Sequence, residues 1–517
     1  MGKYIMALDL GSSGIKVTLF NHRASIVGSK YKEYETIYPG PNMVLQRPTD
    51  WWKSFCEASK ELIIENNIDN NDILCVAPSG QMSALIPIDE NNNLLMDPCL
   101  IWADMRTYSQ VEEIADKFEG QKNFYYTTGI GLPPETFTYS KILWLRQNEF
   151  DIFNKTKYFV QPKEYIGIKL TGNIATDYSD ASETGMFDTK KRKWSPKILD
   201  LIGISESMLP IIKKSSDLLG YITNEASQET GLAKGTPVCV GGGDVSIAAS
   251  GAGITNFGDY YAYIGSGVWV GTSSKDPILD YEKRIACICS TTTEGYTPHV
   301  ISISGGLSQL WARDLINEIP FIKGKITYKD MDALAEKSLV GSSGLIFLPY
   351  LRGGGAPTQN IHTRGAFVGI EPHHTYGDLS RSILEGVAYI TKQMLEFLTN
   401  HTDKKPNELF FIGGGAKSSI WRQIIADVLQ VPIICTSMQQ EANTWGAAKC
   451  AGVCVGIWKD FHEAQKLVPR EIVVEPNVRN ESVYNSFYHT FLETYEQLVP
   501  IYERLTENRK MIAKFRD

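Results

Sequence analysis

Long hydrophobic runs are absent from the sequence, and this absence limits where the protein can reside. No stretch of the 517 residues approaches the roughly 18 uninterrupted apolar residues of a membrane-spanning helix. The N-terminal apolar run is interrupted by Asp9 and is too short for the core of a signal peptide. Position 6 is Met rather than Ser or Thr, so the N-myristoylation pattern is also missing. We therefore expect a cytoplasmic protein without a membrane partner.

Cysteine and histidine are few and show no disulfide or metal-binding pattern. The nine cysteines include no CxxC pair, and an odd number spread along a long chain is unlike a disulfide framework. We expect them to be small core residues in a reducing compartment. Of the eight histidines, only His373 and His374 are adjacent, without the cysteine or acidic cluster of a metal site.

Excess positive charge is absent as well. The 51 lysines and arginines are outnumbered by 59 acidic residues, which gives a formal net charge of −8. This balance argues against nucleic acid as the main partner. The hydrophobic content of 43% is that of a globular protein and excludes disordered or collagen-like chains. A single core stops growing beyond about 250–300 residues, so we expect at least two domains, and length alone suggests about three.

Three common nucleotide-binding patterns are also missing. There is no G-x-x-x-x-G-K-[ST] phosphate loop, and neither an HRD-type catalytic loop nor a DFG motif of protein kinases. Gly265, Gly267 and Gly271 are spaced G-x-G-x-x-x-G, which is not the dinucleotide fingerprint. A nicotinamide-dependent dehydrogenase is therefore a weak alternative, and the lack of any absorbance change with that cofactor would eliminate it.

Two Gly/Ser turns between strand-like runs are present instead. Residues 4–10 and the β-branched run IKVTLFN flank Gly11–Gly14, which predicts a β-hairpin. Residues 259–271, DYYAYIGSGVWVG, repeat this pattern 254 positions later. The turn amides and hydroxyls suit a phosphate and the carboxylate of Asp9 suits Mg²⁺, although a surface hairpin uses the same residues without a ligand. The duplication predicts a two-lobed α/β fold with a nucleotide between the lobes.

Other turns and loops carry polar groups suited to catalysis or binding. In TPVCVGGGDVSIAAS, Asp244 follows three glycines at a helix start, where it either caps the helix or acts as a general base in phosphoryl transfer. The similar turn in FIGGGAKSSIWRQIIAD can lie against a nucleotide base or accept a phosphate. Gln81 in SGQMS, with Asp104 and Arg106 in IWADMR, suits a polyol, but the Asp–Arg pair is equally typical of a surface ion pair.

Together these motifs resemble the FGGY family of carbohydrate kinases, within the actin-like and hexokinase-like (RNase H-like) ATPase superfamily, and in particular its xylulokinases. The likeness covers nearly the whole chain in the family's order, and its most specific part is residues 364–389. The segments that carry it are DLGSSGIKVTLF, QRPTDWW, SGQM, IWADMR, KILWLR, GTPVCVGGGD, YIGSGVWVG, GLIFLPYLRGGGAP, RGAFVGIEPHHTYGDLSRSILEGVAY, FIGGGAKSSIWRQIIADVL and EANTWGAA.

The resemblance implies three parts of the chain and a role for each matching residue. The N-terminal domain, 1–254, would bind the sugar and carry the first phosphate hairpin and the catalytic Asp244. The C-terminal domain, 255–480, would carry the second hairpin and bind adenosine, and 481–517 would be a helical tail. The phosphates of ATP would contact Ser12, Ser13, Lys16 and Ser266, and the adenosine would contact Gly306, Gly415 and Ser419. The sugar pocket would be formed by Gln81, Met82, Ser83, Trp102, Asp104 and Asp244, and Mg²⁺ would be held by Asp9 and Asp244.

Two positions depart from the usual xylulokinase pattern. Ser83 and Val245 stand where these enzymes usually carry a histidine and an asparagine, so two polar sugar contacts are missing and the sugar could differ. The second phosphate turn has GSG in place of GTS, which is a milder change because Ser266 keeps a hydroxyl.

The implied activity is ATP-dependent phosphorylation of a primary hydroxyl on a small ketose, with D-xylulose as the first candidate. The implied cofactors are ATP and Mg²⁺, and the implied assembly is a homodimer. Gluconate, glycerol, erythritol and ribulose remain open as acceptors. A non-catalytic sugar or nucleotide sensor on the same fold is the alternative from another class. The presence of both Asp9 and Asp244 argues against a sensor. An assay in which folded protein converts no ATP to ADP with any sugar would favour the sensor.

Overall fold

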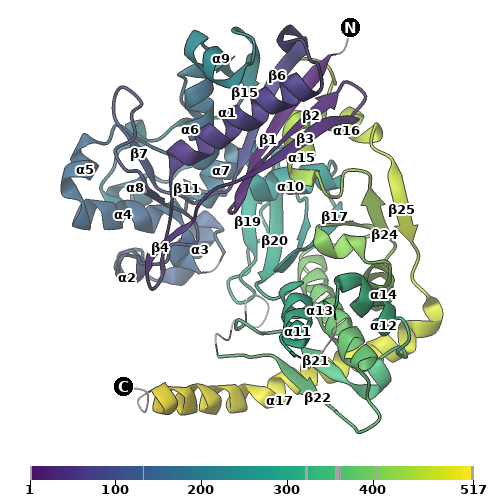
Figure 1. Cartoon of the computed structure of the whole chain (residues 1–517). Helices are drawn as coiled ribbons and strands as arrows, with labels where there is room; N and C mark the ends of the chain where they lie inside the picture. Colours follow the sequence, from purple (N-terminus) through teal and green to yellow (C-terminus); the bar gives the residue numbers. More distant parts are fainter. Residues whose placement is uncertain are drawn as a thin grey trace.

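Two large mixed β-sheets organise the chain into two bodies, one above the other in Figure 1. The computed structural model describes residues 3–131, 133–320, 324–354, 360, 362–402 and 405–513. The upper body in the figure contains the N-terminal half and the lower body most of the C-terminal half. The two-lobed α/β fold predicted from the duplicated hairpin is confirmed.

The N-terminal sheet has the strand order β14–β15–β6–β1–β2–β3, with β16 also paired to β6. Its strands are β1 (Tyr4–Leu10), β2 (Gly14–Asn21), β3 (Ile26–Glu33), β6 (Ile73–Gly80), β14 (Leu218–Tyr221), β15 (Pro237–Cys239) and β16 (Gly242–Gly243). The predicted first hairpin is present, because β1 and β2 pair antiparallel and the Gly11 N–H donates to the Gly14 carbonyl at 3.0 Å.

Helices cover both faces of this sheet, which explains why β1 is apolar along almost its whole length. One face packs on α1 (Pro48–Glu65) and α6 (Pro162–Thr171), and the other packs on α15 (Ala442–Cys454). Helix α15 therefore belongs to the C-terminal half in sequence but covers the N-terminal sheet. It also crosses α10 (Asp244–Ala252) so closely that a Cβ at Gly251 would lie 1.7 Å from the Ala442 carbonyl oxygen.

A helical region extends the N-terminal body on the left of Figure 1. It comprises α2 (Tyr108–Lys117), α3 (Gln121–Thr128), α4 (Thr138–Asn148), α5 (Phe150–Lys155), α7 (Tyr178–Glu183), α8 (Pro196–Ile202) and, farther along the sheet, α9 (Asn224–Thr230). The small strands around it are β4 (Ile37–Gly40), β5 (Met43–Gln46), β7 (Ile86–Ile88), β8 (Cys99–Leu100), β9 (Tyr158–Val160), β10 (Ala175–Asp177), β11 (Phe187–Asp188), β12 (Lys193–Trp194) and β13 (Ile211–Lys213). Its core includes Cys287 and Cys289 from the C-terminal sheet, so the two bodies also meet there.

The C-terminal sheet repeats the central pattern of the first one. Its order is β19–β20–β18–β17–β23–β24–β25, and β17 pairs antiparallel with β18 and parallel with β23, as β1 does with β2 and β6. Its strands are β17 (Tyr260–Ile264), β18 (Val268–Thr272), β19 (Ala286–Cys289), β20 (Tyr296–Ser302), β23 (Leu409–Ile412), β24 (Ile433–Thr436) and β25 (Arg470–Val474). The predicted second hairpin is therefore also confirmed.

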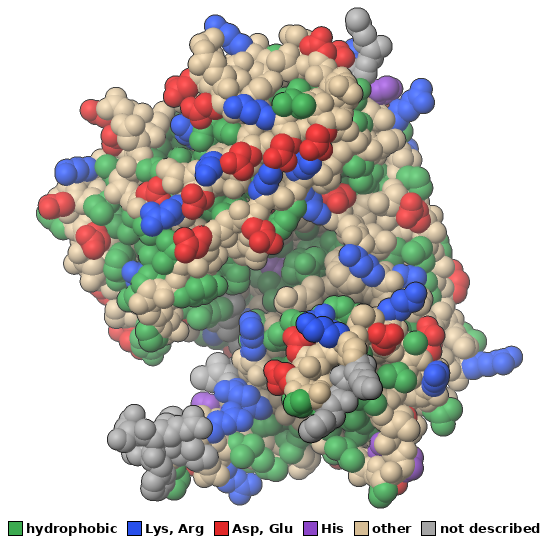
Figure 2. Space-filling view, viewed as in Figure 1, with side chains coloured by type: hydrophobic (Ala, Val, Ile, Leu, Met, Phe, Trp, Pro, Cys, Tyr) green, Lys and Arg blue, Asp and Glu red, His purple; other side chains and the backbone are tan. Residues whose placement is uncertain are grey.

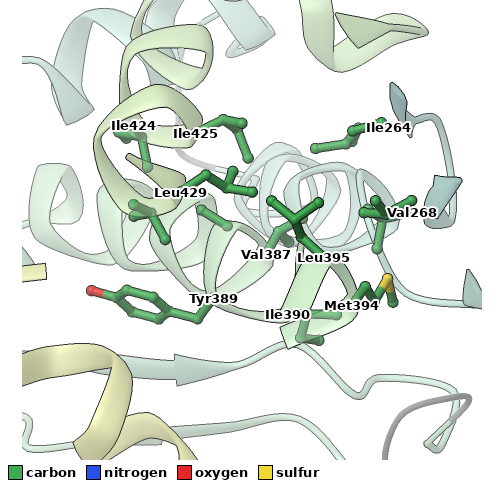
Figure 3. Packing of buried hydrophobic residues seen from close by; sticks show 14 of the residues in the cluster. Ile264, Val268, Val387, Tyr389, Ile390, Met394, Leu395, Ile424, Ile425 and Leu429 are labelled. Atoms are coloured by element: carbon green, nitrogen blue, oxygen red, sulfur yellow. The ribbon is translucent and has the colours of Figure 1, made fainter. Parts of the chain in front are cut away.

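The core of the C-terminal body lies between this sheet and two helices, α13 (Tyr376–Thr399) and α14 (Ser419–Leu429). Figure 3 shows Ile264 and Val268 from the hairpin packed near Val387 and Leu395 of α13, with Ile424 and Leu429 of α14 beside them. Smaller elements complete this body: β21 (Ile346–Leu348), β22 (Ala366–Val368), α11 (Leu307–Asn317) and α12 (Tyr328–Ala335). Helix α16 (Phe461–Lys466) instead packs with α15 on the N-terminal sheet.

The C-terminal segment forms the long helix α17 (Glu481–Ala513), in agreement with the helical tail expected over residues 481–517. Its first turns bury Tyr484, Tyr488 and Phe491 in the C-terminal core, and Figure 1 shows its end extending away from the body. The last four residues of the predicted tail, 514–517, lie outside the described residues. In the part of the chain that is described, no helix combines the length and the apolar character needed to cross a membrane.

Candidate active site

The first hairpin places Asp9 near the end of β1, opposite Lys16 of β2. The buried Oδ1 of Asp9 has no hydrogen-bond partner, while its Oδ2 accepts a hydrogen bond from Asn443 Nδ2 at 3.1 Å. Burial raises the pKa of Asp9, and the Asn443 hydrogen bond and the charge of Lys16 oppose this effect. Asp9 thus offers one carboxylate oxygen that the protein does not use.

Lys16 connects the same hairpin to the start of α15. Its Nζ donates to the Gln440 carbonyl at 3.2 Å and lies 3.2 Å from each carboxylate oxygen of Glu441. Both contacts join residues more than 420 positions apart, so the two halves of the chain meet at this point.

A pocket of about 270 Å³ opens at this junction. It is lined by Asp9, Lys16, Tyr263, Ile412, Gly413, Gly414, Lys417 and Gln439–Thr444. Both hairpins, the glycine turn after β23 and the start of α15 therefore contribute to one cavity. Figure 2 shows the molecular surface hollowed between the upper and lower bodies.

Asp244 lies near Asp9 because of the strand register. Ser79 of β6 pairs with Asp9 on one side and with Gly242 of β16 on the other, and neighbouring strands lie about 4.8 Å apart, so the Cα atoms of Asp9 and Gly242 are about 10 Å apart. Asp244 follows as the first residue of α10. Burial raises its pKa to about 7, and the negative charge of Asp9 adds to this rise.

The triple-glycine turn before Asp244 is required by close packing. Gly241 has φ +74°, and a Cβ there would lie 1.8 Å from the Pro78 carbonyl oxygen. A Cβ at Gly243 would lie 2.5 Å from Met82 Sδ. The loop that carries Met82 therefore packs directly against the residue that precedes Asp244.

The second hairpin gathers three of the residues predicted to bind ATP. The Gly306 N–H donates to the Gly265 carbonyl at 2.8 Å, and the Ser266 carbonyl accepts from Gly305 and Leu307. Gly415 packs on Ile264, where a Cβ would lie 2.9 Å from the isoleucine Cβ. The Ser266 side chain is exposed at the turn. Ser419 is exposed at the start of α14, two residues beyond the pocket residue Lys417.

The predicted sugar residues lie on loops that hydrogen bonds tie to the first hairpin. Gln46 donates to the Ser12 carbonyl at 2.6 Å and accepts from Gln81 at 2.8 Å, which leaves the buried Gln81 Oε1 without a partner. Trp102, 42% exposed, donates to Ser12 Oγ at 2.9 Å. Ser13 is exposed beside Ser12. The loops that carry the predicted sugar residues are therefore in direct contact with the turn predicted to bind phosphate.

Asp104 forms an ion pair, and this pair is buried rather than on the surface. Its carboxylate accepts two hydrogen bonds from the Arg106 guanidinium, at 2.8 and 2.7 Å, one from the Arg106 backbone N–H at 3.3 Å and one from the Val44 N–H at 2.7 Å. The Asp104 side chain has no exposed surface, and that of Arg106 is 13% exposed. The role of Asp104 toward a sugar stays a prediction, since its carboxylate is already engaged by protein donors.

Lys141 of α4 links the loops that carry the predicted sugar residues, which sequence reasoning missed. The lysine has no exposed surface, and its Nζ donates to the carbonyls of Ser83 (2.7 Å), Ile101 (2.8 Å) and Thr136. Burial lowers its pKa to about 7. The apolar run KILWL in which Lys141 stands has no local feature that indicates a polar role.

Glu183, at the end of α7, is a second residue that sequence reasoning missed. Ser83 Oγ donates to the Glu183 carbonyl at 3.1 Å, and the buried Glu183 Oε2 has no hydrogen-bond partner. Burial raises the pKa of Glu183 to about 8, and repulsion by Asp244 adds to the rise. The Glu183 carboxyl group is therefore near enough to the predicted catalytic base for the charge of Asp244 to affect it.

Comparison with known proteins covers both halves of the chain. The model of the N-terminal domain of the FGGY family of carbohydrate kinases matches residues 4–251, and the model of the C-terminal domain matches residues 260–455. The chain belongs to the FGGY family of carbohydrate kinases. Its fold is accordingly the two-domain, actin-like α/β fold of FGGY kinases, which act on their sugars with ATP.

Among the relatives of this FGGY kinase is the xylulose kinase of Lactococcus lactis, which is 29% identical over 507 residues and covers 98% of this chain and 99% of the relative. The crystal structure of a gluconate kinase from Lactobacillus acidophilus superposes with a TM-score of 0.89 at 26% identity, covering 98% of this chain and 100% of the other. A ligand-bound xylulose kinase from the same organism gives 0.88 at 26% identity, covering 97% and 100%.

Proposed function

We infer that this FGGY kinase transfers the γ-phosphoryl group of ATP to a primary hydroxyl of a small ketose, with D-xylulose as the first candidate. The observation that carries the proposal is the placement of Asp9 near the end of β1 and of Asp244 directly after β16, on the two sides of β6, with Asp9 lining a pocket to which both hairpins contribute. The named xylulose kinases among the relatives support the choice of sugar.

In the proposed reaction, Asp244 is the general base. Its carboxylate takes the proton of the attacking hydroxyl, which makes the oxygen a better nucleophile as it approaches the γ-phosphorus. A pKa of about 7 suits this task, because about half of the groups are ionised at neutral pH and the carboxylate is basic enough to accept the proton. Met82, packed on the residue before Asp244, and Gln81, with its unpaired Oε1, shape the sugar end.

The residues also fit Mg²⁺. The free Oδ1 of Asp9 and the carboxylate of Asp244 are hard oxygen donors, and Mg²⁺ in such sites is held by one or two carboxylates with water and phosphate oxygens in the other positions. When bound, Mg²⁺ neutralises charge on the phosphates.

The ATP site of the proposal spans both domains, with the sugar in 1–254 and adenosine in 255–480. The exposed hydroxyls of Ser12, Ser13 and Ser266 are available to phosphate oxygens at the two turns. Lys16, now paired with Glu441, would exchange this partner for a phosphate. Gly306, Gly415 and Ser419 would line the adenosine side. Closure of the lobes would exclude water from the transfer.

An ATP-to-ADP coupled assay with an acceptor panel tests the proposal. D-xylulose, D-ribulose, erythritol, glycerol and gluconate are each supplied with ATP and Mg²⁺, and we expect ADP release that depends on a ketose. Asp244→Ala should abolish it. A variant that retains more than a few per cent of wild-type turnover would refute the assigned base, and silence with every acceptor from folded protein would favour a sensor.

A further inference from the structure

The turn that leads to Asp244 has no side chains of its own. Three glycines, Gly241–Gly243, precede the aspartate. Glycine allows a wider range of backbone conformations than any other residue, so such a turn does not by itself fix the direction of the residue that follows it. Contacts made to the backbone of the turn therefore help to set the position of Asp244.

Two backbone N–H groups anchor this turn, one at each end. The Gly243 N–H donates to Ser179 Oγ of α7 at 3.0 Å. The Gly241 N–H donates to the carbonyl of Ser215, in the loop between β13 and β14, at 2.9 Å. Ser179 has no exposed surface and Ser215 is 4% exposed, so water does not compete for either contact.

A single carboxylate joins the two anchoring serines. Asp177 Oδ2 accepts from the hydroxyl of Ser179 at 2.6 Å and from the hydroxyl of Ser215 at 2.8 Å. A serine hydroxyl has one proton to donate, so once that proton is on Asp177 the Ser179 oxygen acts only as an acceptor toward Gly243. The hydrogen bonds thus run in one direction, from the Gly243 N–H through the Ser179 hydroxyl to the Asp177 carboxylate.

The contacts of Asp177 go beyond those of a helix cap. As the residue before α7 it accepts the backbone N–H groups of Ser179 and Asp180, which is an ordinary N-cap. A cap does not require the Ser215 hydroxyl. It does not require a buried counter-ion either, yet Lys163 Nζ of α6, 1% exposed, lies 3.3 Å from Asp177 Oδ1. The fold therefore builds a complete polar network behind the glycine turn.

We propose that Ser179 and Asp177 are positioning residues that orient Asp244 toward the acceptor hydroxyl by holding the Gly243 N–H. This inference rests on the kinase function proposed above, in which Asp244 is the general base. A base must lie within hydrogen-bond reach of the proton that it takes, and misplacement of a catalytic group by about 1 Å can lower the rate about 100-fold. Loss of the Ser179 hydroxyl should therefore lower kcat while ATP and sugar still bind.

Ser179→Ala in the full-length protein tests this role, with ATP, Mg²⁺ and the acceptor of highest turnover. The matched control is Ser182→Ala, because Ser182 is a second fully buried serine of α7 whose Oγ accepts a backbone N–H, that of Cys289 in β19, at 3.0 Å. Both variants lose a buried hydrogen bond and should melt at similarly lowered temperatures. The kcat of Ser179→Ala should be at least about fivefold below that of Ser182→Ala, with KM for both substrates within about threefold of wild type.

Ser215→Ala provides the same test if Ser179→Ala does not fold. It removes the hydroxyl that donates to Asp177 and keeps the carbonyl that accepts from Gly241. Its kcat should fall at least about threefold relative to Ser182→Ala, again at nearly unchanged KM values. A smaller fall would contradict a role of Asp177 in holding the turn.

Two results with Ser179→Ala would overturn the inference while leaving the kinase function intact. One is a folded variant whose kcat lies within about fivefold of that of Ser182→Ala. The other is a loss of activity that comes from a higher KM at unchanged kcat, which would place Ser179 in substrate binding. If folded wild type phosphorylates no acceptor, or Asp244→Ala keeps wild-type turnover, the proposed function itself fails and the inference fails with it.

Discussion

Replacing Asp244 with asparagine separates the energetic cost of its buried charge from its part in catalysis. The substitution keeps the shape of the side chain and removes the ionisable group. Without a base, kcat should fall by about 10²–10⁴-fold. The folded protein should at the same time become more stable at neutral and alkaline pH, because a carboxylate that the fold disfavours is gone.

The size of this gain follows from the pKa of Asp244. Burial and Asp9 raise it to about 7, against 3.8 for an ordinary aspartate, and each tenfold change in acidity corresponds to about 1.4 kcal/mol. Below about pH 4 the Asp244 carboxyl is protonated whether the chain is folded or not, so its burial does not lower the free energy of unfolding. The folded state loses stability as the pH rises from about 4 to about 7, and the loss then stays near 4 kcal/mol.

Urea unfolding at pH 5 and pH 8, without ATP or Mg²⁺, measures the effect. The free energy of unfolding of Asp244→Asn should be higher than that of wild type at both pH values. The difference between the two proteins should be about 2–3 kcal/mol larger at pH 8 than at pH 5. Asp116→Asn, an exposed position on α2, is the control and should show no such growth. An advantage that is independent of pH, or a variant less stable than wild type at pH 8, would show that the fold does not disfavour the Asp244 charge.

Three further substitutions test other contacts. Lys141→Met removes the buried donor shared by three backbone carbonyls, so KM for the sugar should rise about tenfold or more while KM for ATP stays within about twofold. Equal changes in both KM values would contradict a role of Lys141 in holding the loops that carry the predicted sugar residues. Asn443→Ala removes the donor to Asp9 and should lower the apparent Mg²⁺ affinity in a metal titration of activity. Gly251→Val forces a side chain into the Ala442 carbonyl oxygen, and differential scanning fluorimetry should show a large drop in melting temperature.

Both hairpins could be predicted from the sequence because their signals are local. A Gly/Ser turn between two β-branched or aromatic runs specifies a hairpin almost without reference to the rest of the chain. Repetition of the turn at Gly265 then indicated a second sheet, which the structure contains. Asp9 and Asp244 are candidates in the sequence alone because each lies beside a Gly-rich turn that follows a strand-like run.

The remaining site residues depend on contacts between distant segments. Asn443 reaches Asp9 only because α15 returns from the C-terminal half to cover the first sheet. Lys141 stands in an apolar helix, and its function is visible only when three loops converge on its ammonium group. Glu183 ends a six-residue helix, and burial rather than any motif distinguishes it from a surface glutamate.

The most direct test of the central claim is ³¹P NMR of the reaction mixture of wild-type protein, ATP, Mg²⁺ and D-xylulose. The account predicts a new phosphate monoester resonance coupled to two methylene protons, as in a primary ester, growing in step with ADP. ADP accompanied only by inorganic phosphate, or a spectrum that does not change with any small ketose, would contradict it.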